Sequence, residues 1–205
     1  MTARSLSPST PRGEATRQKV LEAAETVFGE KGYHGASVTE ITRAAGVAQG
    51  TFYLYFKGKK EIFLDLVDAL GNRLRFVTLE ASSRAKDYAE AQRLGFSAFF
   101  TFARNHRHIY RIIQECDRVD PITYRRFYAQ LADAYRRAHA EATARGEAAA
   151  ADPEVVAYCM LGVGHFVALR FLFWDEELSP EAEETAIQYA QKGASRHPLT
   201  DLRPH

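Results

Sequence analysis

The stretch SVTEITRAAGVAQGTFYLYFKGKKEIF, residues 37–63, predicts two short helices joined by a glycine turn, then a stop and a new helix. Ser37 followed three residues later by Glu40 is a capping-box pattern, in which each side chain serves the backbone N–H of the other residue. Gly46 stands where a helix commonly ends in a left-handed residue. These signals together predict a helix-turn-helix.

The second of these helices should begin near Ala48 or Gln49 and last about two turns. Phe52 and Phe56, one turn apart, should point inward. The outward positions carry hydrogen-bonding groups rather than the usual Glu and Lys, namely Gln49, Thr51, Tyr53 and Tyr55. An αα-hairpin within a helical bundle has the same shape. The shortness of the helix, its exterior and the flanking cations Arg43, Lys57, Lys59 and Lys60 favour a helix that reads DNA.

Residues 13–63 resemble the DNA-binding domain of the TetR family of bacterial repressors. The resemblance rests on five segments at fixed spacing, which are the first helix with Arg17 and Phe28, then FGEKGY (28–33), SVTEI (37–41), AAGV (44–47) and GTFYLYFKGK (50–59). One departure is Ala48, where family members often have a serine that caps the reader helix. Without that hydroxyl, the N–H groups at this end are left to water or a phosphate.

The resemblance implies roles for individual residues. Gln49, Gly50, Thr51 and Tyr53 would face base edges or the adjacent backbone, and Tyr55 and Lys59 would contact phosphates. Ser37, Thr39 and Arg43 lie where the supporting helix would meet the DNA backbone. The predicted DNA-binding set is therefore Ser37, Thr39, Arg43, Gln49, Gly50, Thr51, Tyr53, Tyr55, Lys57 and Lys59.

The charge of the chain is uneven along its 205 residues. Residues 1–60 hold nine Lys and Arg against five Asp and Glu, a net charge of +4, and the remaining residues hold eighteen against twenty-one, a net charge of −3. The positive part contains the helix-turn-helix, as phosphate binding requires.

The fold class expected is all-α, with an N-terminal three-helix domain and a C-terminal helical ligand-binding and dimerisation domain. The expected boundaries are a disordered arm at 1–12, the DNA-binding domain at 13–58, the second domain at 59–194 and a flexible tail at 195–205. Further helices are expected at about 60 to the low 80s, 87–104, 106–116, 121–146, 153–174 and 179–193.

Cellular location follows from what the sequence lacks. Residues 1–13 are polar and form no signal peptide, and no apolar run is expected to reach the ~18 residues that span a bilayer. The two cysteines, Cys116 and Cys159, have no partner at a metal-ligand spacing. A cytoplasmic protein with no membrane association and with reduced thiols is expected.

The segment 153–174 has almost no polar side. A helix that is apolar all round must be buried on several sides. One side can face its own domain, and the other can face a second subunit, with Gly162 and Gly164 allowing close approach. A central core helix in a monomer is the alternative. A homodimer is favoured because a palindromic operator is read by a two-fold symmetric protein.

Aromatic side chains are dense between residues 88 and 174. Most must be packing, but a pocket lined by rings and a few polar groups is the usual form of a ligand site. The predicted ligand-binding set is Phe99, Phe102, Arg104, Tyr110, Tyr124, Phe127, Tyr128, Tyr158, His165 and Phe166. Arg93, Arg104, Arg107 and Arg111 form either an anion clamp, for example for an acyl-coenzyme A thioester, or an ion-paired helix face.

Other classes of function have little support in the sequence. There is no G-x-S-x-G, Walker loop, dinucleotide fingerprint or HExxH motif, so neither an enzyme nor a cofactor is predicted. His106, His108 and His165 lack the spacing of metal ligands. The prediction is a repressor that a hydrophobic or aromatic small molecule releases from double-stranded DNA. The alternatives are a ligand-independent architectural protein and an activator with the same fold.

Overall fold

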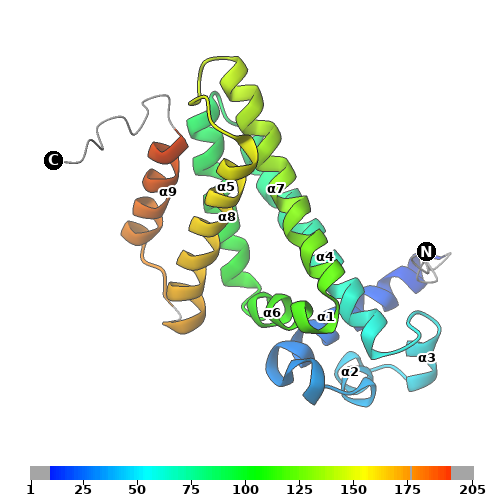
Figure 1. Ribbon diagram of the computed structural model, residues 1–205. Coiled ribbons are helices and arrows are strands. Elements are labelled where there is room, and N and C mark those ends of the chain that lie inside the picture. The colour runs from blue at the N-terminus through cyan, green and yellow to red at the C-terminus, as the bar shows by residue number, and fades with distance from the viewer. Residues whose placement is uncertain (1–9, 176, 195–205) are drawn as a thin grey trace. The chain divides into compact units, whose positions relative to one another are not determined.

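The computed structural model describes residues 10–175 and 177–194, and within these ranges every regular element is a helix (Figure 1). The elements are α1 (Pro11–Gly35), α2 (Val38–Ala45), α3 (Gln49–Tyr53), α4 (Lys59–Ser82), α5 (Tyr88–Asn105), α6 (Ile109–Val119), α7 (Pro121–Ala144), α8 (Pro153–Ala168), the π-helical turn η1 (Leu169–Trp174) and α9 (Pro180–Ala194). The all-α prediction is confirmed. Residues 1–9 of the predicted arm and the predicted tail 195–205 lie outside the described residues, and Pro11 and Arg12 form the first turn of α1.

The contacts within the chain define two compact units. The first contains Met1–Leu70 and His108–Phe127, and the second contains Gly71–Arg107 and Tyr128–His205. Both α4 and α7 therefore have residues in each unit. The predicted boundary at residue 58 falls at the start of α4 and leaves α6 in the second domain, whereas the contacts divide α4 after Leu70 and group α6 with the helix-turn-helix.

The first unit has a core of aromatic and aliphatic side chains from α1 to α4. The Phe63 ring lies edge-on to Phe28, with centroids 5.1 Å apart, and to Tyr33, with centroids 4.9 Å apart. Phe52 and Phe56 are fully buried, as their spacing predicts. Burial of large rings contributes most of the apolar stabilisation in so small a unit.

The second unit packs α5 against α8 and α9 around Phe96, Phe100 and Met160. Asp152 caps α8 by accepting the N–H groups of Glu154 and Val155, and Pro153 follows at the first helical position. The predicted helix 153–174 is therefore present, although its last six residues form η1.

The helix Pro153–Trp174 is 22 residues long with a mean hydropathy of 1.8, which is enough by length and composition to cross a membrane. The expectation that no segment reaches this length is therefore corrected. In this structure 39% of its most apolar window is buried within the chain. A core helix of a soluble protein passes the same test.

Candidate nucleic-acid interface and ligand cavity

The supporting helix α2 is held at its start by the predicted capping box. Ser37 Oγ accepts the N–H of Glu40 at 3.2 Å, and Glu40 Oε2 accepts the N–H of Ser37 at 2.9 Å. Lys31 forms an ion pair with the same carboxylate. The hydrogen bonds from Lys31 and then Ser37 lower the pKa of Glu40 to about 2. The Glu40 carboxylate therefore stays ionised at neutral pH. Thr39 and Arg43, the other predicted DNA-binding residues of α2, are exposed.

The turn between α2 and α3 has the left-handed residue that the sequence predicts. Gly46 has φ 61° and ψ 39°, and its N–H is donated to Arg43 O at 3.1 Å. Only glycine adopts this backbone routinely. At the next helix, Ala48 occupies the cap position and makes no side-chain hydrogen bond there. The start of α3 is thus left open to an external acceptor.

The reader helix is shorter than expected, because α3 spans five residues and ends at Tyr53. Tyr55 lies in the following turn, where its N–H is donated to Phe52 O at 3.0 Å. Gln49, Gly50 and Tyr53 are exposed, whereas Thr51 and Tyr55 are half-buried. Leu54, which sequence reasoning did not select, is 64% exposed beside them. The exposed side of α3 therefore combines hydrogen-bonding groups with one apolar side chain.

The predicted phosphate contact Lys59 has protein partners in this structure. Its ammonium donates to Tyr33 O at 2.8 Å, Ala36 O at 2.9 Å and His34 O at 3.4 Å. It also lies 4.7 Å from the centroid of the Tyr33 ring. These carbonyls end α1, where a helix carries partial negative charge. The geometry favours a structural role for Lys59, whereas Lys57 is exposed.

Lys59→Met is expected to destabilise the protein by about 1–3 kcal/mol, because it removes charged hydrogen bonds to three carbonyls. Lys57→Met is the matched control and should leave the melting temperature unchanged while weakening DNA binding. Thermal unfolding and DNA titration of both variants provide the measurement. If Lys59→Met lost DNA affinity at an unchanged melting temperature, a direct phosphate contact would be the better explanation.

Helix α6 contacts α1 within the first unit. Arg111 donates to Gly29 O at 3.1 Å and to Glu30 O at 2.8 Å, and Glu115 accepts the N–H of Tyr33. Gly32 interrupts α1 with φ 73°, and a Cβ there would lie 2.5 Å from Glu115 Oε1. Arg111, one of the four arginines considered as an anion clamp or an ion-paired helix face, thus binds the end of α1.

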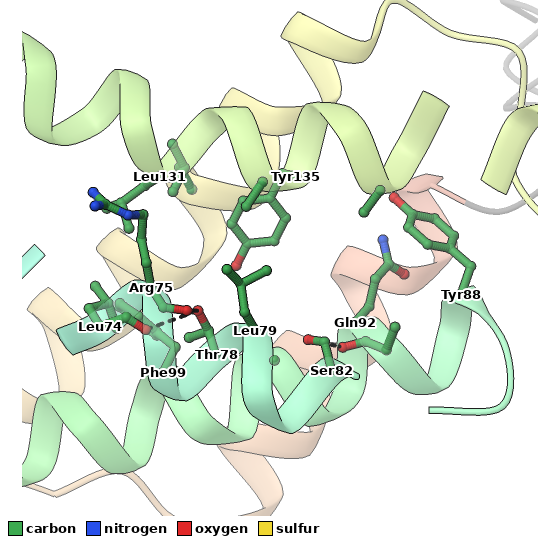
Figure 2. A pocket seen from close by; sticks show the side chains of 15 residues that line it. Leu74, Arg75, Thr78, Leu79, Ser82, Tyr88, Gln92, Phe99, Leu131 and Tyr135 are labelled. Carbon is green, nitrogen blue, oxygen red and sulfur yellow. Dashed lines mark hydrogen bonds between the residues drawn. The ribbon is translucent and has the colours of Figure 1, made fainter. Parts of the chain in front are cut away.

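The second unit contains a cavity of about 110 Å³ (Figure 2). It is lined by Leu74, Arg75, Thr78, Leu79 and Ser82 from α4, Tyr88, Ala91, Gln92, Gly95 and Phe99 from α5, Leu131, Ala134, Tyr135 and Ala138 from α7, and Leu161 from α8. Figure 2 shows the Tyr135 ring extending from α7 toward α4, with Leu79 below its hydroxyl. An apolar lining with a few polar groups is typical of a small-molecule site.

Of the predicted ligand-binding residues, Phe99 alone lines this cavity. Phe102 is buried against His106, Arg104 forms an ion pair with Glu183, and Tyr128 OH lies 3.5 Å from His165 Nδ1. Tyr158 and Phe166 are exposed. Tyr110, Tyr124 and Phe127 belong to the first unit, where Tyr124 lines a polar hollow with Arg111 and Arg118. The roles assigned to these residues stay predictions.

Sequence reasoning missed Gln92 and Tyr135, although one signal was present. Tyr88, Gln92, Gly95, Phe96 and Phe99 follow one another at helical spacing, so the glutamine interrupts an otherwise apolar or aromatic stripe. Gln92 is 6% exposed. A polar side chain on the buried stripe of a helix indicates either a satisfied core group or the lining of a cavity.

The helix-turn-helix also carries the similarity to known proteins. Residues 20–66 match the family described as bacterial regulatory proteins, tetR family. The uncharacterized HTH-type transcriptional regulator YdgC of Bacillus subtilis is 32% identical over 105 residues, which are 49% of this chain and 54% of that protein. The HTH-type transcriptional activator FasR of Mycolicibacterium smegmatis is 34% identical over 109 residues, which are 53% and 49% of the two chains. The chain thus matches about half the length of these relatives.

Similarity in three dimensions extends beyond the matched segment. The transcriptional regulator FadR from Bacillus subtilis, solved in complex with stearoyl-CoA, has a TM-score of 0.75 at 20% identity, covering 86% of this chain and 98% of its own. The fold and the α2–α3 geometry define an all-helical protein of the helix-turn-helix class. Its segment 20–66 is that of the tetR family of bacterial regulatory proteins.

Proposed function

We propose that this protein is a cytoplasmic, ligand-responsive repressor that binds a palindromic operator as a homodimer. The observation that carries the proposal is the helix-turn-helix itself, with a capped α2, a left-handed Gly46 and an α3 whose exposed side holds Gln49 and Tyr53. Glutamine bonds adenine bidentately in the major groove, and exposed Gly50 lets a phosphate or base edge approach the backbone. The predicted DNA-binding set is retained as part of the proposal. Lys59 would act indirectly, by stabilising the end of α1.

The dimer interface proposed is the exposed side of α8 together with α9. Val155, Tyr158 and Phe166 recur along one side of α8 and are 59%, 47% and 67% exposed. Tyr189 on α9 is 78% exposed. A Cβ added at Gly162 would meet no atom within 4 Å. Large apolar side chains exposed together mark an interaction surface, and a second copy suits a two-fold operator.

The ligand is proposed to bind in the cavity of the second unit. The cavity volume of about 110 Å³ is below the ~150 Å³ of a cavity that holds benzene. A long acyl chain, such as the one bound by FadR, would therefore have to separate the lining helices. Residues 74–82 of α4 would move, and α4 continues into the helix-turn-helix unit. A coupling of ~1–3 kcal/mol would lower operator affinity by roughly five- to 150-fold.

Activation is the second candidate, because the matched relative FasR is named an activator. The two outcomes differ in the sign of the coupling between ligand and DNA. A compound that raises the melting temperature binds the folded protein. Its effect on the affinity for a selected operator then separates release from recruitment. Equal affinity for selected and scrambled DNA would instead indicate an architectural protein.

Gln49→Ala is expected to relax sequence preference at particular base pairs by ~1–3 kcal/mol, because a bidentate contact is lost. Lys57→Ala should weaken binding to all sequences about equally. Gly50→Ala should leave stability unchanged or raise it by about 0.5–1 kcal/mol, since its Cβ would meet nothing within 4 Å, and yet weaken DNA binding. Sequence selection from a random duplex library, followed by anisotropy titration, measures all three. Unchanged affinity and preference in every variant would contradict the assignment of α3 as reader.

A further inference from the structure

The polar groups that line the cavity differ in whether the protein already satisfies them. Thr78 donates to Leu74 O at 3.0 Å, and Ser82 donates to Ala91 O at 3.0 Å. Tyr88 OH lies 3.1 Å from His139 Nδ1. Gln92 Nε2 reaches Met160 Sδ at 3.8 Å, which is a weak acceptor. The hydroxyls of Thr78, Ser82 and Tyr88 are therefore occupied.

The Tyr135 hydroxyl is different. Among the described residues, nothing forms a hydrogen bond with it, although it faces the cavity (Figure 2). Its ring packs against Phe96, with centroids 6.4 Å apart, so the ring is held in place. Burial raises the pKa of Tyr135 to about 12, and the group stays a neutral donor at physiological pH. Tyr135 is half-buried, and its hydroxyl offers the cavity a donor that a ligand acceptor could use.

The charges around the cavity limit the kind of acceptor. Arg75 is the cation among the lining residues, and its guanidinium donates to the side-chain oxygens of Gln130 and Asn72 in exposed hydrogen bonds. In the part of the chain that the structure describes, no other lysine, arginine or histidine lines the cavity. Figure 2 shows the guanidinium of Arg75 beside Leu131 and away from the Tyr135 hydroxyl. A carboxylate held by Tyr135 would therefore lose hydration without a cation beside it, which is unfavourable.

We propose that the cavity selects an uncharged ligand whose carbonyl oxygen accepts the hydrogen bond of Tyr135, with alkyl groups on either side of that carbonyl. Ketones, esters and thioesters fit this description, and free fatty acid anions do not. The cavity volume of about 110 Å³ is below that of a cavity that holds benzene, so it would closely enclose only the carbonyl and the adjoining carbons of such a ligand. This inference rests on the proposed ligand-binding function and names the chemical class that it recognises.

The test compares 2-pentanone, pentanoate and pentane by titration monitored with protein NMR, without DNA. The ketone should bind about two- to tenfold more tightly than pentane, as one net hydrogen bond provides, and more tightly than pentanoate. In Tyr135→Phe the ketone should lose this advantage, while pentane binds as before. Tyr33→Phe removes a tyrosine hydroxyl in the first unit that does not line the cavity, and it should leave all three affinities unchanged.

Three results would overturn the inference. The first is that no probe binds at millimolar concentration. The second is that Tyr135→Phe keeps the preference for the ketone. The third is that pentanoate binds most tightly and loses affinity in Arg75→Gln. Each leaves operator binding untouched, so failure of the cavity chemistry is separable from failure of the DNA-binding proposal.

Discussion

Phe166→Glu is expected to convert a dimer into monomers. Phe166 is 67% exposed on α8, so within one chain its replacement removes little packing. In a dimer joined through α8, the same position would be desolvated, and an unpaired carboxylate there would be strongly unfavourable. Sedimentation at micromolar concentration should change from twice the 23.0 kDa chain mass to the chain mass itself. The melting transition of the monomer should remain cooperative.

The same substitution should weaken operator binding by ~10²–10⁴-fold, because the two half-sites would no longer be bound by linked reader helices. Ile122→Glu is the control, since Ile122 is 77% exposed but lies on α7 in the first unit. It should keep the dimer. If wild-type protein were monomeric at every concentration and still bound a palindrome tightly, the α8 interface would be excluded.

Residues that begin or end helices explain why much of the fold could be predicted from the sequence. Ser37 with Glu40 begins α2, Gly46 ends it, and Pro153 and Pro180 stand at the first positions of α8 and α9. Each of these signals acts through backbone hydrogen bonds or a fixed φ angle within a few residues. Such signals depend only on a few neighbouring residues. The helix starts at Val38, Pro153 and Pro180 accordingly match the predictions.

The cavity could not be predicted in the same way. Counting aromatic side chains selects well-packed regions, because large rings fill the space between helices. The space here lies where facing helices carry small residues, namely Ala91 and Gly95 on α5 and Ala134 and Ala138 on α7. Whether two such sites face one another depends on packing between helices distant in sequence. The grouping of α6 with α1 depends on the same kind of contact.

Gly29→Ala is expected to destabilise the protein, although alanine normally favours a helix. Gly29 lies within α1, and an alanine in an open helical site would add about 0.5–1 kcal/mol of stability. At Gly29, however, a Cβ would overlap the His108 ring and its Cβ. Overpacking of this kind typically costs about 1–3 kcal/mol, so the steric term outweighs the propensity term. Chemical denaturation should show a lower midpoint with an unchanged slope.

A double-mutant cycle with His108 separates the steric contact from any other effect at Gly29. His108→Gly removes both the overlapping ring and the overlapping Cβ, and His108 makes no side-chain hydrogen bond at the start of α6. In that background, Gly29→Ala should become neutral or stabilising, so the two substitutions should be strongly non-additive. If Gly29→Ala were equally destabilising with and without the histidine side chain, contact with His108 would not be the reason that residue 29 must be glycine. The sign reversal would show that α6 packs on α1 in solution, which local sequence signals do not reveal.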